Sequence, residues 1–176
     1  MPIYDVFHSY PLTDVQCDDL ARRITDLHTS TFTVTSGLVH VRFTEYGEKK
    51  HYMGGKKMTG QMNMVVGKVR TGSNRSQDQW EALCRQIEAA WIASVGADVI
   101  KSEPKATLAA VFVHGGLAAV YEQGFMAPVA GKDGEWLCKN FCAFEKLAEA
   151  GNPFFQDMVA EIRAREDLSF VLKGVA

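Results

Sequence analysis

Several features that would mark particular classes of protein are absent or scarce in this sequence. Its 176 residues include only four cysteines, and none of them forms a Cys-x-x-Cys pair, which argues against a zinc ribbon or a thioredoxin-like redox motif. No apolar run approaches the roughly 18–20 residues that span a bilayer. The start shows no basic segment followed by an apolar one, as a secretory signal would. We therefore expect a cytoplasmic protein without a membrane partner.

An excess of positive charge is also absent. The chain has 19 basic and 21 acidic residues, with a formal net charge of -2, so nucleic acid is not an expected partner. Hydrophobic residues make up 47% of the chain, enough for a real core in a protein of this size. The cysteines are expected to be small buried hydrophobic residues on helix faces, with no metal ligand among them; they are Cys17, Cys84, Cys138 and Cys142.

The chain contains two similar halves. Strand patterns at 3–7 and 38–43 flank a helical pattern at 13–28, and strand patterns at 62–70 and 107–113 flank another at 76–91. Residues 46–60, rich in Lys and Gly, indicate a hairpin excursion. The helices share a 63-residue offset that matches four pairs of residues: Thr13 with Ser76, Gln16 with Gln79, Leu20 with Leu83, and Ile24 with Ile87.

This repeat predicts an α/β (α+β) fold made of a duplicated β-α-β unit, at about 1–60 and 61–124. Right-handed crossovers place both helices on one face of a four-stranded sheet. The other face then needs a partner, which predicts an oligomer. We expect residues 1–136 to form this domain and 137–176 to form a helical C-terminal extension, packed on the core or on a neighbouring subunit, with a helix starting at Asn152-Pro153.

Pro2 is the first candidate for chemistry. A small second residue permits removal of Met1, which would leave a secondary amine at the start of a strand. An α-amino group titrates near 8 in model peptides, and burial or nearby cations lower that pKa. A neutral amine near pH 7 is a competent general base. A proline that only begins an edge strand remains the alternative.

Four other residues are candidates for the same site. Arg70 and Arg75 flank one turn, where two guanidinium groups suit a carboxylate, although they could equally be solvated surface residues. His28 falls on the apolar face of the first helix, where a core histidine is the plain alternative. Glu122 is otherwise an ordinary surface acid.

Taken in order, these segments resemble the cis-3-chloroacrylic acid dehalogenase group of the tautomerase superfamily. The resemblance covers about the first 136 residues and is carried by Pro2-Ile3-Tyr4, Leu12-Thr13, Ile24 to His28, Val41 to Glu45, Tyr52 to Gly55, Arg70-Thr71-Gly72, Arg75-Ser76, Tyr121 to Gly124, and Gly134-Glu135-Trp136. It implies a trimeric, cofactor-independent enzyme with the duplicated β-α-β fold.

The resemblance also implies a role for each candidate. Pro2 is expected to be catalytic, His28 to bind substrate or orient water, and Glu122 to activate water. Arg70 and Arg75 are expected to bind the substrate carboxylate. Two departures stand out: Ser73-Asn74 lengthens the arginine-bearing turn, and Phe112, expected as a wall of the substrate site, replaces a tyrosine whose hydroxyl would assist hydration. His114 lies near this position.

The missing hydroxyl favours tautomerisation of a small 2-oxo or enol carboxylic acid, with neutral Pro2 as the general base. The alternative within enzymes is hydration, dehalogenation or decarboxylation of 3-substituted acrylates or propiolates. There Pro2 would be a cationic acid, and Glu122 with His28 would position water. A third alternative is a non-catalytic trimeric binding module.

Overall fold

The computed structural model describes residues 1–47, 49–58, 62–72 and 75–173. The Ser73-Asn74 insertion therefore lies outside the described residues. The strands are β1 (Ile3–His8), β2 (His40–Glu45), β3 (His51–Met53), β4 (Lys56–Met58), β5 (Met64–Val69), β6 (Ala110–Gly115), β7 (Tyr121–Glu122) and β8 (Phe125–Met126). The helices are α1 (Asp14–Phe32), α2 (Gln77–Val95), α3 (Ala97–Ser102), α4 (Asp133–Glu149), α5 (Pro153–Ala164) and α6 (Ser169–Lys173).

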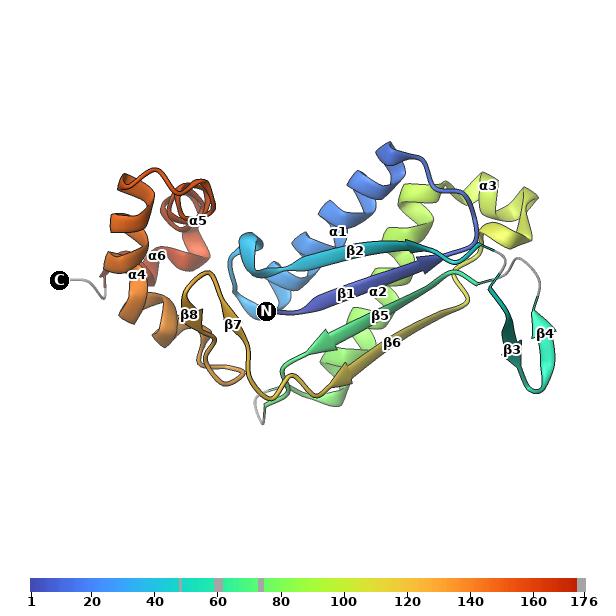
Figure 1. The fold of residues 1–176 in the computed structure, drawn as a ribbon, viewed down its shortest axis with the longest axis horizontal. Coiled ribbons are helices and arrows are strands. Elements are labelled where there is room, and N and C mark those ends of the chain that lie inside the picture. The colour runs from blue at the N-terminus through green and yellow to red at the C-terminus, as the bar shows by residue number, and fades with distance from the viewer. Residues whose placement is uncertain (48, 59–61, 73–74, 174–176) are drawn as a thin grey trace.

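The main sheet has the strand order β2-β1-β5-β6. Strand β1 is parallel to β2, β5 is parallel to β6, and the central pair β1 and β5 is antiparallel. Helices α1 and α2 lie together on one face of this sheet (Figure 1). The duplicated β-α-β arrangement predicted from the repeat is confirmed, and so is the hairpin excursion, which forms β3 and β4.

Both helices begin as their sequences predict. The Thr13 hydroxyl accepts a hydrogen bond from the Gln16 amide, and the Gln16 side chain accepts one from the Thr13 amide. Ser76 and Gln79 make the same reciprocal pair at the start of α2. Such caps stabilise a helix by about 1 kcal/mol each.

Tyr4 lies in the core between the sheet and the two helices. Its ring is fully buried, and its hydroxyl is 2.8 Å from Nδ1 of His28. Gly67, opposite Tyr4 on β5, makes room for this ring, because a Cβ there would lie 2.9 Å from the Tyr4 ring. The hydrogen bond between Tyr4 and His28 thus holds the start of β1 against α1.

None of the described helices covers the opposite face of the sheet (Figure 1). Near its centre the half-buried face holds Asp5, whose carboxylate pairs with Arg42 at 2.6 Å and with Lys68 at 2.8 Å. Burial raises the pKa of Asp5, but the hydrogen bonds from Lys68 and Arg42 lower it overall. On the edge strand β6, Phe112 is 55% exposed. This mixed apolar and charged face is the one that the sequence predicts to need a partner.

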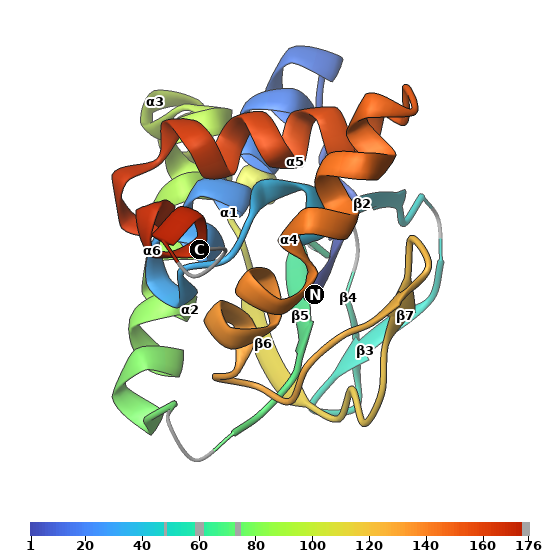
Figure 2. The same ribbon diagram turned by 90° about the vertical axis from the view of Figure 1, so that its left-hand side faces the viewer.

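The C-terminal helices α4, α5 and α6 pack on one another around a second buried cluster. In Figure 1 they form a separate layer at one end of the sheet, and in Figure 2 this layer lies beside the N-terminus. Helix α5 begins at Pro153 with Asn152 as its cap, as predicted. Helix α4 already begins at Asp133, four residues before the expected start of the extension.

One helix was not predicted, and one prediction needs correction. The short helix α3 was not anticipated. The cysteines were expected to be buried, but Cys142 is exposed and Cys17, Cys84 and Cys138 are only half-buried. Cys84, Cys138 and Cys142 each come directly after a buried residue of their helix and so lie beside its buried face. Within the described ranges, no group of three or more metal-binding side chains is present. No described helix is long and apolar enough to cross a membrane.

Candidate active site

The amino terminus is buried at the edge of the main sheet. Met1 and Pro2 are both buried, and the Pro2 carbonyl accepts a hydrogen bond from the His40 amide at 3.1 Å, extending the β1–β2 pairing. Burial lowers the pKa of the Met1 amino group from 8.0 to about 5, and the positive charges of Arg70 and Arg75 lower it too. The chain therefore starts in a place that disfavours a cation.

Arg70 follows the last residue of β5, which directs its side chain towards this end of the sheet. The guanidinium group is 2.5 Å from the Asp133 carboxylate and also donates to the Pro128 carbonyl. Both Arg70 and Asp133 are buried, and Nε of Arg70 has no hydrogen-bond partner. The pair is thus desolvated but not fully satisfied.

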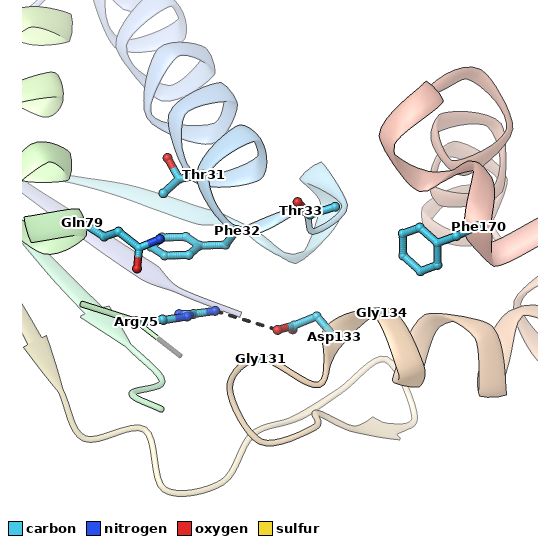
Figure 3. A pocket seen from close by; sticks show the side chains of 9 residues that line it. All are labelled: Thr31, Phe32, Thr33, Arg75, Gln79, Gly131, Asp133, Gly134 and Phe170. Carbon is cyan, nitrogen blue, oxygen red and sulfur yellow. Dashed lines mark ion pairs between the residues drawn. The ribbon is translucent and has the colours of Figure 1, made fainter. Parts of the chain in front are cut away.

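Arg75 precedes the cap of α2 and joins the same cluster. It donates from Nη1 to the Arg70 carbonyl at 3.0 Å, and its Nη2 lies 3.8 Å from Oδ2 of Asp133. Its guanidinium carbon is 4.1 Å from the ring centroid of Phe32, in cation–π contact. Figure 3 shows Arg75 and Asp133 facing each other. The two arginines predicted as a carboxylate clamp are therefore adjacent.

Asp133 is the functional candidate that sequence reasoning missed. An acid in the first turn of a helix is normally explained by the helix dipole, so nothing local marks it. Only the fold brings it to Arg70, 63 residues away in the chain. Its Oδ2 has no hydrogen-bond partner although it is buried. Arg70, Arg75 and Asp133 together carry a net charge of about +1, whereas the two arginines alone would carry about +2.

His28 is linked to Arg75 through the ring of Phe32. Its ring forms a hydrogen bond with the Tyr4 hydroxyl and packs on Phe32, with ring centroids 4.6 Å apart. Phe32 also makes the cation–π contact with Arg75. Burial, and then the positive charges of the amino terminus, Arg75 and Arg70, lower the pKa of His28 to about 2. The imidazole is therefore neutral at any ordinary pH.

Glu122 lies on β7, where its charge acts on the amino terminus. The carboxylate accepts a hydrogen bond of 2.8 Å from Nε2 of His40. Sequence analysis did not single out His40. His40 lies opposite Ile3 in the β1–β2 pair, and this pairing of distant segments, which no local pattern encodes, brings it to Glu122.

Phe112 is not brought to this cluster within one chain. It lies opposite Val66, four residues before Arg70, and belongs to the open face of the sheet. His114 is two residues further along the same exposed edge strand. The structure thus gathers Pro2, Arg70, Arg75 and Glu122 around the amino terminus, with His28 behind them and Phe112 elsewhere.

Two hollows adjoin the arginine pair. One, of about 240 Å³, is bordered by Arg75, Asp133 and Phe170 (Figure 3). The other, of about 370 Å³, is bordered by Arg70, Thr71 and residues 116–120 and 126–130. Small polar molecules therefore have room on both sides of the Arg70–Asp133 pair.

A duplicated β-α-β sheet with a buried amino terminus beside paired arginines defines a protein of the tautomerase superfamily. The chain belongs to the family described as "Putative oxalocrotonate tautomerase enzyme", whose model matches residues 1–140. The resemblance drawn from the sequence is confirmed at this level. No curated protein sequence matches the chain.

Solved structures support the same fold. A member of the cis-3-chloroacrylic acid dehalogenase family called N1 is 21% identical, with a TM-score of 0.60 and with 90% of this chain and 96% of that chain covered. An asymmetric trimer of wild-type fused 4-OT is 14% identical, with a TM-score of 0.54 and coverages of 71% and 95%. Native fused 4-OT is 19% identical, with a TM-score of 0.52 and the same coverages. At these identities the likeness concerns the fold.

Proposed function

We propose that the protein is a tautomerase of small 2-oxo or enol carboxylic acids, with Pro2 as its general base once Met1 is removed. The supporting observation is the setting of the Met1 amino group, one residue from the Pro2 nitrogen, where burial and the charges of Arg70 and Arg75 lower the pKa of an amine; we expect the same two arginines to lower the pKa of the Pro2 amine. An amine that is neutral near pH 7 can accept a proton without first losing one. No cofactor is invoked.

In this mechanism Arg70 and Arg75 hold the substrate carboxylate. Pro2 nitrogen takes the enol hydroxyl proton, and the electron pair left on oxygen forms the ketone as the double bond shifts. Pro2 then returns the proton to the carbon atom of the former double bond. The guanidinium groups stabilise the enolate charge while it exists.

Asp133 has two effects on this chemistry. Its contact with Arg70 orients the guanidinium group from the side of α4. Its charge also offsets one of the two arginine charges, so that Arg70, Arg75 and Asp133 together carry about +1. We therefore expect monocarboxylic acids to bind better than dicarboxylic acids.

Hydration, dehalogenation or decarboxylation of acrylates and propiolates is the second candidate. It needs a cationic Pro2 and a carboxylate free to activate water. The lowered pKa of the neighbouring Met1 amino group argues against the first requirement, and the bond between Glu122 and His40 argues against the second. A binding module without catalysis is the third candidate, and it predicts no turnover of any acid.

We also propose that three copies assemble through the open face of the sheet. Its uncovered surface includes the exposed ring of Phe112, and the trimeric fused 4-OT structures share this fold. In this assembly Phe112 is buried against a neighbouring subunit. A cytoplasmic location remains our expectation.

Turnover of phenylenolpyruvate tests the proposal. The protein is first shown by intact mass to lack Met1, and wild type is then compared with Pro2→Ala processed in the same way. We expect ketonisation by wild type and a loss of at least about 100-fold in Pro2→Ala, the usual scale for removing a general base. Equal rates would rule out Pro2 as the base, and turnover of 3-chloroacrylate or propiolate alone would favour the second candidate.

A further inference from the structure

His40 is hydrogen-bonded to two residues of the candidate active site. Its backbone amide donates a hydrogen bond of 3.1 Å to the Pro2 carbonyl, and its Nε2 donates one of 2.8 Å to the Glu122 carboxylate. An ionised carboxylate can only accept, so Nε2 carries the hydrogen atom of this bond. One residue of β2 thus holds Pro2 through its backbone and Glu122 through its side chain.

The backbone bond suits a residue whose nitrogen has to stay free. A proline in a chain has no amide hydrogen to give to a sheet, and the Pro2 nitrogen can act as a base only if it is not engaged elsewhere. The carbonyl of Pro2 is the group by which β2 holds it, next to the first register pair of the two strands, Ile3 with His40. Replacing the His40 side chain leaves this backbone bond available.

Glu122 reaches the same place from a different part of the fold. It lies on the β7–β8 hairpin, where it pairs with Phe125 across a two-residue turn. The ring of Phe125 packs against aromatic rings of the C-terminal helices α4 and α5. Pro2 is therefore held by the sheet and Glu122 by the C-terminal layer, and the side chain of His40 joins the two.

We propose that His40 is a positioning residue, whose side chain holds the Glu122 carboxylate where it stabilises the cation formed when Pro2 takes up the substrate proton. This inference rests on the proposed function, in which Pro2 is the general base. The Glu122 side chain is 15% exposed, and among the described residues His40 is its only hydrogen-bond partner. Because an unsatisfied buried charge is costly, a Glu122 that loses this donor is expected to turn towards water, away from the amine.

The charges near the amino terminus show what this placement controls. Ionisable side chains from five parts of the chain lie within electrostatic reach of it: Arg70 after β5, Arg75 before α2, Asp133 on α4, Glu122 on β7 and His28 on α1. Burial and the two arginines lower the pKa of the Met1 amino group, whereas Asp133 and Glu122 raise it. We expect the same signs at the Pro2 amine. Asp133 is held by Arg70, so Glu122 is the acid whose effect on the amine depends on His40.

Titration of the Pro2 amine by ¹⁵N NMR in the Met1-free protein measures this effect without any turnover. His40→Leu removes the donor, and we expect the pKa of the amine to fall by about 1, the scale of one nearby carboxylate. Glu122→Gln is expected to give the same fall, and the double variant no further fall. His40→Gln keeps an N–H donor near the Nε2 position and is expected to restore the wild-type pKa.

Trp136→Phe separates positioning from a merely structural link. Nε1 of Trp136 donates a hydrogen bond of 2.8 Å to the Met126 carbonyl, so it also ties the hairpin to α4, through a bond that does not involve Glu122. We expect Trp136→Phe to lower the free energy of unfolding and to leave the pKa of the Pro2 amine unchanged. An unchanged amine pKa in His40→Leu, or an equal fall in Trp136→Phe, would overturn the positioning role.

The outcomes also separate this inference from the proposed function. The expected fall in His40→Leu, without turnover of any enol acid, would support the positioning role and refute only the proposed function. Turnover that depends on Pro2, with an amine pKa that does not respond to His40→Leu, would refute only the positioning role. If His40→Leu fails to fold, His40→Asn replaces it, because its shorter side chain keeps a donor but does not reach the Nε2 position, so the same fall is expected.

Discussion

Asp133→Asn removes the charge that links α4 to the arginines while keeping the side chain's shape. At an effective dielectric constant of about 20, two unit charges 2.5 Å apart, as in the Arg70–Asp133 pair, attract by about 6–7 kcal/mol. Desolvation offsets part of this attraction, and breaking one partner of a buried pair costs about 3–5 kcal/mol. We expect the free energy of unfolding to fall by that amount.

Urea unfolding at pH 7 measures this loss, and Asp167→Asn is the matched control. Asp167 also pairs with an arginine, Arg165, at 2.6 Å, but it is about half exposed. An exposed pair contributes about 0–1 kcal/mol. Equal losses in the two variants would refute the idea that burial makes the Asp133 pair strong.

The same variant tests the charge argument. Without Asp133 the two arginines carry about +2, so the affinity for a dicarboxylic acid such as succinate should rise relative to that for butyrate. Calorimetry on the Met1-free variant measures the ratio. An unchanged ratio would contradict the role of Asp133 in selecting monocarboxylic acids.

Three further predictions concern single residues. Burial lowers the pKa of His28 to about 2, so below pH 6.5 the unfolded state binds a proton that the folded state does not. The free energy of unfolding should therefore fall as the pH falls, by at most about 1.4 kcal/mol per pH unit. In His28→Gln, the free energy of unfolding measured in urea should depend less on pH between pH 4 and 7. Because Glu122 raises the pKa of the amino terminus, Glu122→Gln should move the acid limb of the kcat/KM profile to lower pH, and a shift to higher pH would contradict this electrostatic role. If three copies assemble as proposed, Phe112→Lys should dissociate the proposed trimer in sedimentation experiments, whereas a variant that stays trimeric would exclude the open face as the interface.

Local signals in the sequence predicted most of the fold. The caps at Thr13 and Ser76 depend on residues three positions away, and the apolar stripes of the two long helices record which side chains face the sheet. The 63-residue repeat then supplied the topology without any long-range information. Helix α3 was missed because its six residues are too few to show a helical period, although Val99 and Ile100 pack against the core.

The candidate site was only partly predictable. Arg70 and Arg75 could be paired because one turn joins them, but Asp133 and His40 reach the site through contacts between distant segments. The burial of Met1 depends on how α4 to α6 pack, which no local pattern encodes. The face of Phe112 was likewise set by sheet register rather than by its neighbours in sequence.

The pKa of the Pro2 amine tests the central claim most directly. The protein is labelled with ¹⁵N-proline, its mass is used to establish that Met1 is absent, and the amine is titrated by NMR. The account predicts a pKa of about 7 or lower, below the roughly 8 of an ordinary α-amino group, so that Pro2 is largely neutral at physiological pH. A pKa well above 8, or a chain that retains Met1, would contradict it.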